Sequence, residues 1–147
     1  MKVRDVMTKS IATIEPDATI KDAASIMQQY NVGSIPVVDN NGLVGIVTDR
    51  DIVVRNIASG QDPFSTPVRN IMTSQVTTVT PEEDLTSIVE VMSTRQVRRL
   101  PVVEGQKLVG MVSLGDIATT GKTNMEASEA LCEISKPSKP LKKNFTN

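Results

Sequence analysis

The sequence contains no histidine and no tryptophan, and it has a single cysteine, Cys132. Without histidine the chain lacks the commonest general base and the commonest ligand of transition metals. One cysteine forms neither an internal disulfide nor a zinc site built from thiolates. Most hydrolytic and redox chemistries therefore lack their usual residues, and we expect a protein that is not an enzyme and that uses no catalytic cofactor or metal.

Aromatic residues are also scarce, because the 147 residues include one tyrosine and two phenylalanines. Apolar residues still make up 39% of the chain, so aliphatic side chains and methionine must form the core. No apolar run approaches the roughly 20 residues that span a bilayer, and the first residues lack a secretory core. We therefore expect a cytoplasmic protein. The net charge of −1 also predicts no attraction for an anionic membrane or for nucleic acid.

The sequence repeats itself at a spacing of 65 residues, from Val3 to Val68. The motif VRDVMT returns as VRNIMT, IPVV returns as LPVV, and LVGIVT returns as LVGMVS, without a gap. The chain is therefore a duplication. We predict a first repeat over residues 1–60 and a second over residues 66–121. Residues 122–147 are predicted to form a C-terminal helix and a flexible basic tail.

Each repeat has the same predicted order of elements. Thr19 and Asp84 are suitable N-caps for an amphipathic helix, and Gly60 and Gly121 are suitable stops for a later one. The predicted strands cover residues 11–14, 35–38 and 43–47 in the first repeat and residues 76–79, 100–103 and 108–112 in the second.

The predicted fold class is α+β, with two β-α-β-β-α repeats packed about a pseudo-twofold axis. A repeat of about 60 residues buries too little surface to be stable alone, so each needs the other. Such a pair encloses two related clefts, and clefts of this kind are the usual place for a small ligand.

A hydroxyl residue and a carboxylate stand where the last strand of each repeat turns into a helix. They are Thr48 and Asp51 in the first repeat and Ser113 and Asp116 in the second. A helix start attracts phosphate, and a carboxylate accepts hydrogen bonds from a ribose diol. The same spacing is also that of a capping box, in which both side chains serve only the helix. From the residues alone, both interpretations stay open.

The doubled pattern, IPVVD followed by LVGIVTDRDI, closely resembles the CBS domain, named for cystathionine β-synthase. A tandem pair of these domains is called a Bateman module, and the resemblance covers residues 1 to about 120. It implies clefts that bind adenosine-containing ligands such as AMP, ADP, ATP or S-adenosylmethionine. It also implies that the hydroxyl residue and the aspartate at each strand-to-helix turn hold phosphate and ribose.

The resemblance assigns two sites, each drawing on both repeats. The first consists of Thr48, Arg50, Asp51, Thr78, Val79, Val97, Arg98, Arg99 and Leu100. The second consists of Thr13, Ile14, Val32, Gly33, Ser34, Ile35, Ser113 and Asp116.

The two repeats differ most where Arg98 and Arg99 replace Gly33 and Ser34. Two guanidinium groups beside a helix start suit a polyanion, so we expect the Asp51 cleft to be the better phosphate site. The other interpretation of the arginines is that they are solvated charges at a strand edge.

The leading prediction is a non-catalytic sensor, in which a bound adenosine compound changes the geometry between the repeats. An effector protein, whose identity the sequence does not give, would respond to that change. The resemblance also implies a homodimer formed through the helices. The alternative is an assembly module that binds no ligand and serves dimerisation only.

Overall fold

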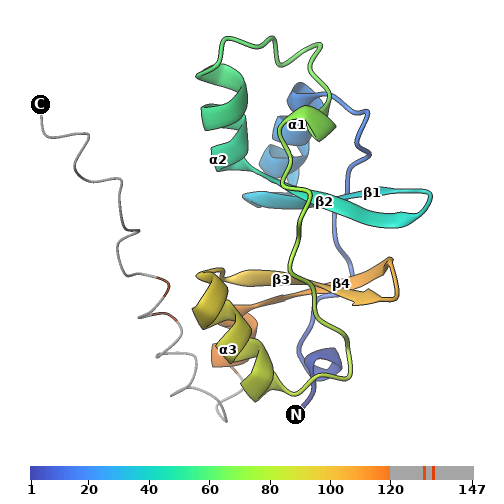
Figure 1. Ribbon diagram of the computed structural model, residues 1–147, viewed down its shortest axis with the longest axis vertical. Helices are drawn as coiled ribbons and strands as arrows, with labels where there is room; N and C mark the ends of the chain where they lie inside the picture. The colour runs from blue at the N-terminus through green and yellow to red at the C-terminus, as the bar shows by residue number, and fades with distance from the viewer. Residues whose placement is uncertain (120–130, 132–133, 135–147) are drawn as a thin grey trace, which may run out of the picture. The chain divides into compact units, whose positions relative to one another are not determined.

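The computed structural model describes residues 1–119, together with residues 131 and 134. The helices and strands follow a common order in the two repeats, which confirms the α+β class (Figure 1). The first repeat has α1 (Ile20–Tyr30), β1 (Ser34–Asp39), β2 (Gly42–Thr48), α2 (Asp49–Asp51) and the π-helical segment η2 (Ile52–Ile57). The second has α3 (Leu85–Arg95), β3 (Arg99–Glu104), β4 (Lys107–Ser113) and α4 (Leu114–Ala118). The predicted C-terminal helix and tail lie outside the described residues, except for Leu131 and Ile134.

Both predicted N-caps are confirmed. The Thr19 hydroxyl accepts a hydrogen bond from the backbone amide of Asp22 at 3.2 Å, and the Asp84 carboxylate accepts one from the amide of Thr86 at 3.2 Å. These bonds satisfy amides that have no partner inside the helix. Both helices end on a non-glycine residue with a positive φ of about 55°, a feature that the sequence does not reveal.

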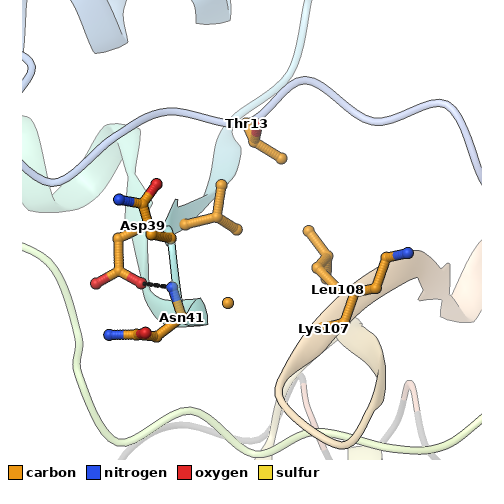
Figure 2. Close-up of a pocket in the computed structure, with 8 residues that line it drawn as sticks. Thr13, Asp39, Asn41, Lys107 and Leu108 are labelled. Carbon is orange, nitrogen blue, oxygen red and sulfur yellow. Dashed lines mark hydrogen bonds between the residues drawn. The ribbon is translucent and has the colours of Figure 1, made fainter.

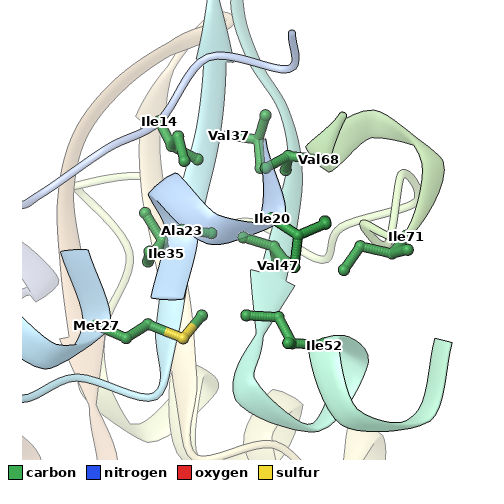
Figure 3. Close-up of a cluster of buried hydrophobic side chains, with 10 residues drawn as sticks. All are labelled: Ile14, Ile20, Ala23, Met27, Ile35, Val37, Val47, Ile52, Val68 and Ile71. Carbon is green, nitrogen blue, oxygen red and sulfur yellow. The ribbon is translucent and has the colours of Figure 1, made fainter. Parts of the chain in front are cut away.

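The strands form two hairpins, β1 with β2 and β3 with β4. In the first hairpin, Ser34 pairs with Thr48 and Asp39 with Gly42, so the chain turns between the strands predicted over residues 35–38 and 43–47. The helices α1 and α2 cover one face of this hairpin (Figure 1). Aliphatic side chains fill the space between them, as the sequence requires (Figure 3). The buried cluster comprises Ile14, Ile20, Ala23, Met27, Ile35, Val37, Val47, Ile52, Val68 and Ile71.

The first predicted strand of each repeat is wrong as a strand, because it makes only a single bridge. The Ile14 amide donates to the Pro36 carbonyl at 3.1 Å, and the Val38 amide donates to the Ile14 carbonyl at 2.9 Å. The next bond in one direction would need an N–H from Pro36, and in the other an N–H from Pro16. Proline has no N–H, so the ladder stops after one residue.

The second repeat has the same arrangement. Val79 forms one parallel bridge to Val102, with a bond of 3.0 Å from the Val79 amide to the Pro101 carbonyl. Pro81 and Pro101 occupy the positions of Pro16 and Pro36. The prolines therefore end the ladder in both repeats at the same point.

The second helix of the first repeat widens into a π-helix after its first turn. The Ala58 amide donates to the Val53 carbonyl five residues earlier, at 2.9 Å. Asn56 lies in this segment with a fully buried side chain, whose nitrogen and oxygen have no hydrogen-bond partner within the described residues. The helix ends before Gly60, whose φ of 77° confirms the predicted glycine stop. The other predicted stop, Gly121, lies outside the described residues.

The opening segment of each repeat packs with residues of the other repeat. Val3, in the 3-10 turn η1 (Val3–Asp5), is fully buried, and its amide donates to the Glu83 carbonyl at 3.0 Å. Ion pairs from Lys2 and Arg4 to Glu82 hold the same segment.

The matching segment of the second repeat is the 3-10 turn η3 (Val68–Asn70). The Val68 amide donates to the Ala18 carbonyl at 2.8 Å, and Arg69 forms an ion pair with Asp17. Val68 and Ile71 belong to the buried cluster of the first repeat. The repeats therefore exchange their opening arms, and the sequence alone did not predict this exchange.

Accordingly, the compact units do not coincide with the repeats. One unit comprises Met1–Met7, Glu82–Leu100 and residues from Val112 onward, and the other comprises Thr8–Pro81 and Pro101–Met111. Within the described part of the chain, no helix combines the length and the apolar character that a membrane crossing requires.

Candidate functional site

The strand-to-helix corner of the first repeat is built on a backbone hydrogen bond. The Asp49 amide donates to the Gly33 carbonyl at 2.9 Å, and Ser34 pairs with Thr48 across the hairpin. This bond brings the loop after α1 against the start of α2. The predicted site residues Val32, Gly33 and Ser34 therefore lie beside Thr48.

Thr48 and Asp51 form a complete capping box at this corner. The Thr48 hydroxyl accepts from the Asp51 amide at 3.1 Å, and Asp51 Oδ2 accepts from the Thr48 amide at 2.9 Å. Asp51 Oδ1 lies 3.7 Å from Arg55 Nε, and the carboxylate is largely buried. The structural role of these side chains is thus observed directly, while Arg50 stays exposed.

The second repeat has an equivalent corner. The Leu114 amide donates to the Arg98 carbonyl at 2.8 Å. The Ser113 hydroxyl accepts from the Asp116 amide, and Asp116 Oδ2 accepts from the Ser113 amide, both at 3.0 Å. Arg98 and Arg99 therefore lie beside Ser113, and both are exposed.

The two corners carry opposite charge where their loops meet the helix. In the first repeat, Gly33 lies under the Asp49 carboxylate, whose Oδ2 would be 3.0 Å from a Cβ at residue 33. In the second repeat, Arg98 stands at the glycine position and the buried Leu114 at the aspartate position. At these two positions the first corner therefore has a carboxylate and the second a guanidinium group. Sequence reasoning missed the role of Asp49, although the glycine at residue 33 was a signal for it.

Four predicted ligand contacts have side chains that are buried: Ile14, Ile35, Val79 and Leu100. Such residues can offer a ligand only their backbone groups. Thr13 and Thr78, which precede Ile14 and Val79, are exposed, and Val32 and Val97 are half-buried. These four side chains remain accessible, so the predicted sites keep a polar and an apolar component.

The predicted site residues that the structure brings together belong, at each corner, to a single repeat. Residues 32–34 lie with Thr48, and residues 98–99 lie with Ser113. The prediction that the Asp51 site uses residues 97–100, and that the Asp116 site uses residues 32–35, remains a prediction.

A pocket of about 520 Å³ lies at the turn between β1 and β2. Thr13 and Leu108 face this space opposite the turn, where the Asn41 amide donates to Asp39 Oδ1 at 2.8 Å (Figure 2). Lys107 also lines this pocket. Thr13 is the one predicted site residue on this pocket, so the pocket does not reproduce either predicted site.

Three comparisons place the chain among known proteins. The CBS domain model matches residues 3–56 and again residues 68–121. The chain is 44% identical over 133 residues to the CBS domain-containing protein YhcV of Bacillus subtilis, covering 90% of this chain and 94% of YhcV.

Two solved structures share the fold. The first is the crystal structure of Hypoxic Response Protein I with two coordinated zinc ions. It has a TM-score of 0.75 and 32% identity, and the match covers 81% of this chain and 98% of that one. The hexameric CBS-CP12 protein from bloom-forming cyanobacteria has a TM-score of 0.72 and 29% identity, covering 85% of this chain and 73% of that one. Among residues 1–119, 131 and 134 of the present chain, no three metal-binding side chains of the His, Cys, Asp or Glu type gather. The chain therefore belongs to the CBS-domain proteins and is a tandem CBS pair, a regulatory module of the Bateman type.

Proposed function

We propose that this CBS pair is a cytoplasmic sensor that binds an adenosine-containing ligand and passes the binding event to an effector protein. AMP, ADP, ATP and S-adenosylmethionine are the candidate ligands. The observation that carries the proposal is the corner that occurs twice. In each copy a backbone hydrogen bond joins the loop to the helix start, and a capping box joins the hydroxyl residue to the aspartate. The ligand would signal by preferring one arrangement of the repeats over another.

Each aspartate can accept further hydrogen bonds beyond the one in its capping box. Asp116 uses Oδ2 for the Ser113 amide, and Asp51 uses Oδ2 for the Thr48 amide. A carboxylate has two oxygens and about four acceptor positions, so Oδ1 can accept from a ribose hydroxyl while the cap stays intact. The capping and ligand roles are therefore compatible.

The second corner supports a phosphate-bearing ligand. Arg98 and Arg99 are exposed, and no acidic side chain stands at the position of Leu114. A charge-assisted hydrogen bond contributes about 1.5–3 kcal/mol, so each such bond from an arginine would add roughly 10- to 150-fold to the affinity for a phosphate. The Asp51 site, which is expected to use these arginines, would prefer ATP or ADP to adenosine.

Self-association is the second part of the proposal. A similar CBS protein, CBS-CP12, forms hexamers. If the present chain binds no adenosine compound, self-association alone would describe an assembly module, which is the competing function.

Calorimetry and thermal shift with each candidate ligand test the sensor. We expect Asp116→Asn and Asp51→Asn to weaken binding at least about tenfold, because a hydrogen-bonded carboxylate is lost. Asp22→Asn is the matched control, since Asp22 forms the same capping box with Thr19 at 3.1 and 3.2 Å. It should lower stability by a similar amount and leave affinity unchanged.

The phosphate assignment has its own test. The double variant R98A/R99A should lose affinity for ATP while binding of adenosine is unchanged. A wild-type chain that shows no shift with any of the four ligands would overturn the sensor and leave the assembly module.

A further inference from the structure

The side chain of Arg55 contacts both the proposed Asp51 site and the opening arm of the second repeat. Arg55 Nε lies 3.7 Å from Asp51 Oδ1, and Arg55 Nη1 donates a hydrogen bond of 3.2 Å to the Ile71 carbonyl. Ile71 belongs to residues 68–73, which we call the second arm. A guanidinium group has five N–H donors in fixed directions, so it can serve two partners at once.

The second arm is fixed to the first repeat by its backbone and by its side chains. Val68 and Ile71 are buried in the core of that repeat. The Thr73 amide donates to the Ile46 carbonyl at 2.8 Å, and the Ile46 amide donates to the Thr73 carbonyl at 3.0 Å. Ile46 lies in β2, the strand that leads to the candidate site. The hydrogen bond from the guanidinium group is a further link between this arm and the site.

The arginine faces the oxygen of Asp51 that a ligand would use. Asp51 Oδ2 accepts from the Thr48 amide at 2.9 Å, which leaves Oδ1 for a ribose hydroxyl. Only 13% of the Asp51 side chain is exposed, whereas the Arg55 side chain is 53% exposed. Because so little of the carboxylate is accessible, a hydroxyl that reaches Oδ1 must displace the guanidinium group at least in part.

The capping box does not require this arginine. In the second repeat, Asp116 forms the same box with Ser113, with both bonds at 3.0 Å. At the spacing of 65 residues, threonine at residue 120 stands in the position of Arg55. Threonine is uncharged, so it cannot form the matching ion pair. The arginine is therefore particular to the first repeat, and it makes the two proposed ligand sites chemically different.

We propose that Arg55 couples the Asp51 site to the second arm. It competes with the ribose of an adenosine ligand for Asp51 Oδ1, and once displaced it holds the Ile71 carbonyl less firmly. Such coupling is reciprocal, so the docked arm weakens binding and the bound ligand loosens the arm. Arg55 is thus a positioning residue that regulates the site. This inference rests on the proposed function and names the residue through which binding would reach the second repeat.

The first test measures the affinity of the full chain for adenosine by calorimetry. Adenosine carries the ribose diol but no phosphate, so the charge of Arg55 does not attract it. In the Asp116→Asn background, which weakens the other site, Arg55→Ala should tighten binding about two- to fivefold, because a half-exposed ion pair is lost. The matched control is Arg55→Ala in the Asp51→Asn background, where the Asp116 site remains and the affinity should not change.

The second test follows amide hydrogen exchange in the second arm. In the Asp116→Asn chain, adenosine should speed the exchange of residues 71–73 at least about twofold, because Arg55 is displaced. In the Arg55→Ala variant of that chain, exchange should already be as fast without adenosine and should not respond to it. A role of Arg55 in stability alone would leave the Asp116→Asn chain unresponsive, and Arg55→Ala would not tighten binding.

The outcomes separate the two proposals. A wild-type chain that binds neither adenosine nor any of the four candidate ligands overturns the proposed function and this inference together. If a candidate ligand binds, the inference alone is overturned by an absence of adenosine binding, by an affinity that Arg55→Ala leaves unchanged or lowers, or by unchanged exchange in the second arm. If Arg55→Ala fails to fold, Arg55→Gln provides the same binding test, since glutamine keeps a donor for the Ile71 carbonyl and carries no charge.

Discussion

The carboxylate of Asp49 covers Gly33, while its amide donates a 2.9 Å hydrogen bond to the Gly33 carbonyl. A Cβ at residue 33 would lie 3.0 Å from Asp49 Oδ2 and 3.4 Å from Asp49 Cγ. In the second repeat, Arg98 stands at the position of Gly33 and Leu114 at the position of Asp49. That repeat therefore has a long side chain in place of the glycine and no carboxylate in place of the aspartate. We therefore expect the residues at these two positions to depend on each other.

Gly33→Ala should cost about 0.5–1 kcal/mol of unfolding free energy, because the exposed Asp49 carboxylate must move by a few tenths of an ångström. In the Asp49→Ala background the same change should cost almost nothing. Urea unfolding of the four proteins in this double-mutant cycle measures the coupling. Equal costs in both backgrounds would contradict the dependence.

Gly45→Ala should destabilise the first repeat by about 2–4 kcal/mol, because overpacking here meets backbone. An added Cβ would lie 2.8 Å from the Thr73 carbonyl oxygen and 2.7 Å from Met72 Sδ. Thr73 cannot retreat easily, since its amide donates to the Ile46 carbonyl at 2.8 Å.

Gly115→Ala is the matched control for the Gly45 variant. A Cβ there would have only the Ser113 hydroxyl within 4 Å, at 3.7 Å. Alanine is the better helix former, so we expect a gain of up to about 1 kcal/mol in α4. The midpoints of thermal and urea unfolding should fall for Gly45→Ala and rise for Gly115→Ala. A shift of both variants in the same direction would contradict this packing.

Stability should fall at acid pH partly through Asp84. Hydrogen bonds from the Thr86 side chain and amide, aided by the N-terminal ammonium group, lower the pKa of Asp84 from its ordinary value of 3.8. A carboxyl group with a lowered pKa in the folded state stabilises the protein above its unfolded pKa. That contribution is lost as the pH falls through the folded value.

The measurement is the unfolding free energy between pH 6 and about pH 2.5. Asp84→Asn should flatten the part of the slope below about pH 4, because the titrating group is gone. Thr86→Ala should flatten it less, since the hydrogen bond from the backbone amide at 3.2 Å remains. A slope that neither variant alters would show that Asp84 does not contribute.

Val3→Ala should destabilise the protein by about 1–3 kcal/mol, although residue 3 lies near the start of the chain. Its side chain is fully buried, as is that of Val68, and Val68→Ala should cost a similar amount. Val53→Ala, at a position that is 57% exposed, is the control and should change the monomer's stability by less than about 0.5 kcal/mol. Chemical denaturation at a protein concentration low enough to suppress association compares the three.

Local patterns predicted most of the elements. The N-caps Thr19 and Asp84 and the alternation of the hairpin strands are signals within a few residues, so they survive in the fold. The first strand of each repeat was wrong because prolines on both sides of the pairing limit it, and one of them lies far along the chain, as Pro36 does for the segment ending at Ile14. The π-helical segment around Asn56 also escaped prediction, since its composition is that of an ordinary helix.

In the candidate site, too, the sequence predicted the local contacts and not the distant ones. The capping pairs Thr48–Asp51 and Ser113–Asp116 are confirmed as local geometry. The proposed use of these pairs by a ligand would depend on residues from the other repeat, and spacing along the chain does not indicate whether those residues come close. The contact of Asp49 with Gly33 is equally non-local, because α1 and the hairpin must form before the two residues meet.

The exchanged arms have a consequence for the history of the chain. A fragment cut at the boundary of the first repeat would carry Val3 without Glu83, whose carbonyl accepts the Val3 amide. It would also lack Val68 and Ile71, which complete its own core. In an ancestor with one repeat, two molecules would therefore have to pack their first residues against each other. Fusion of two copies of the gene would then convert this contact between molecules into a contact within one chain.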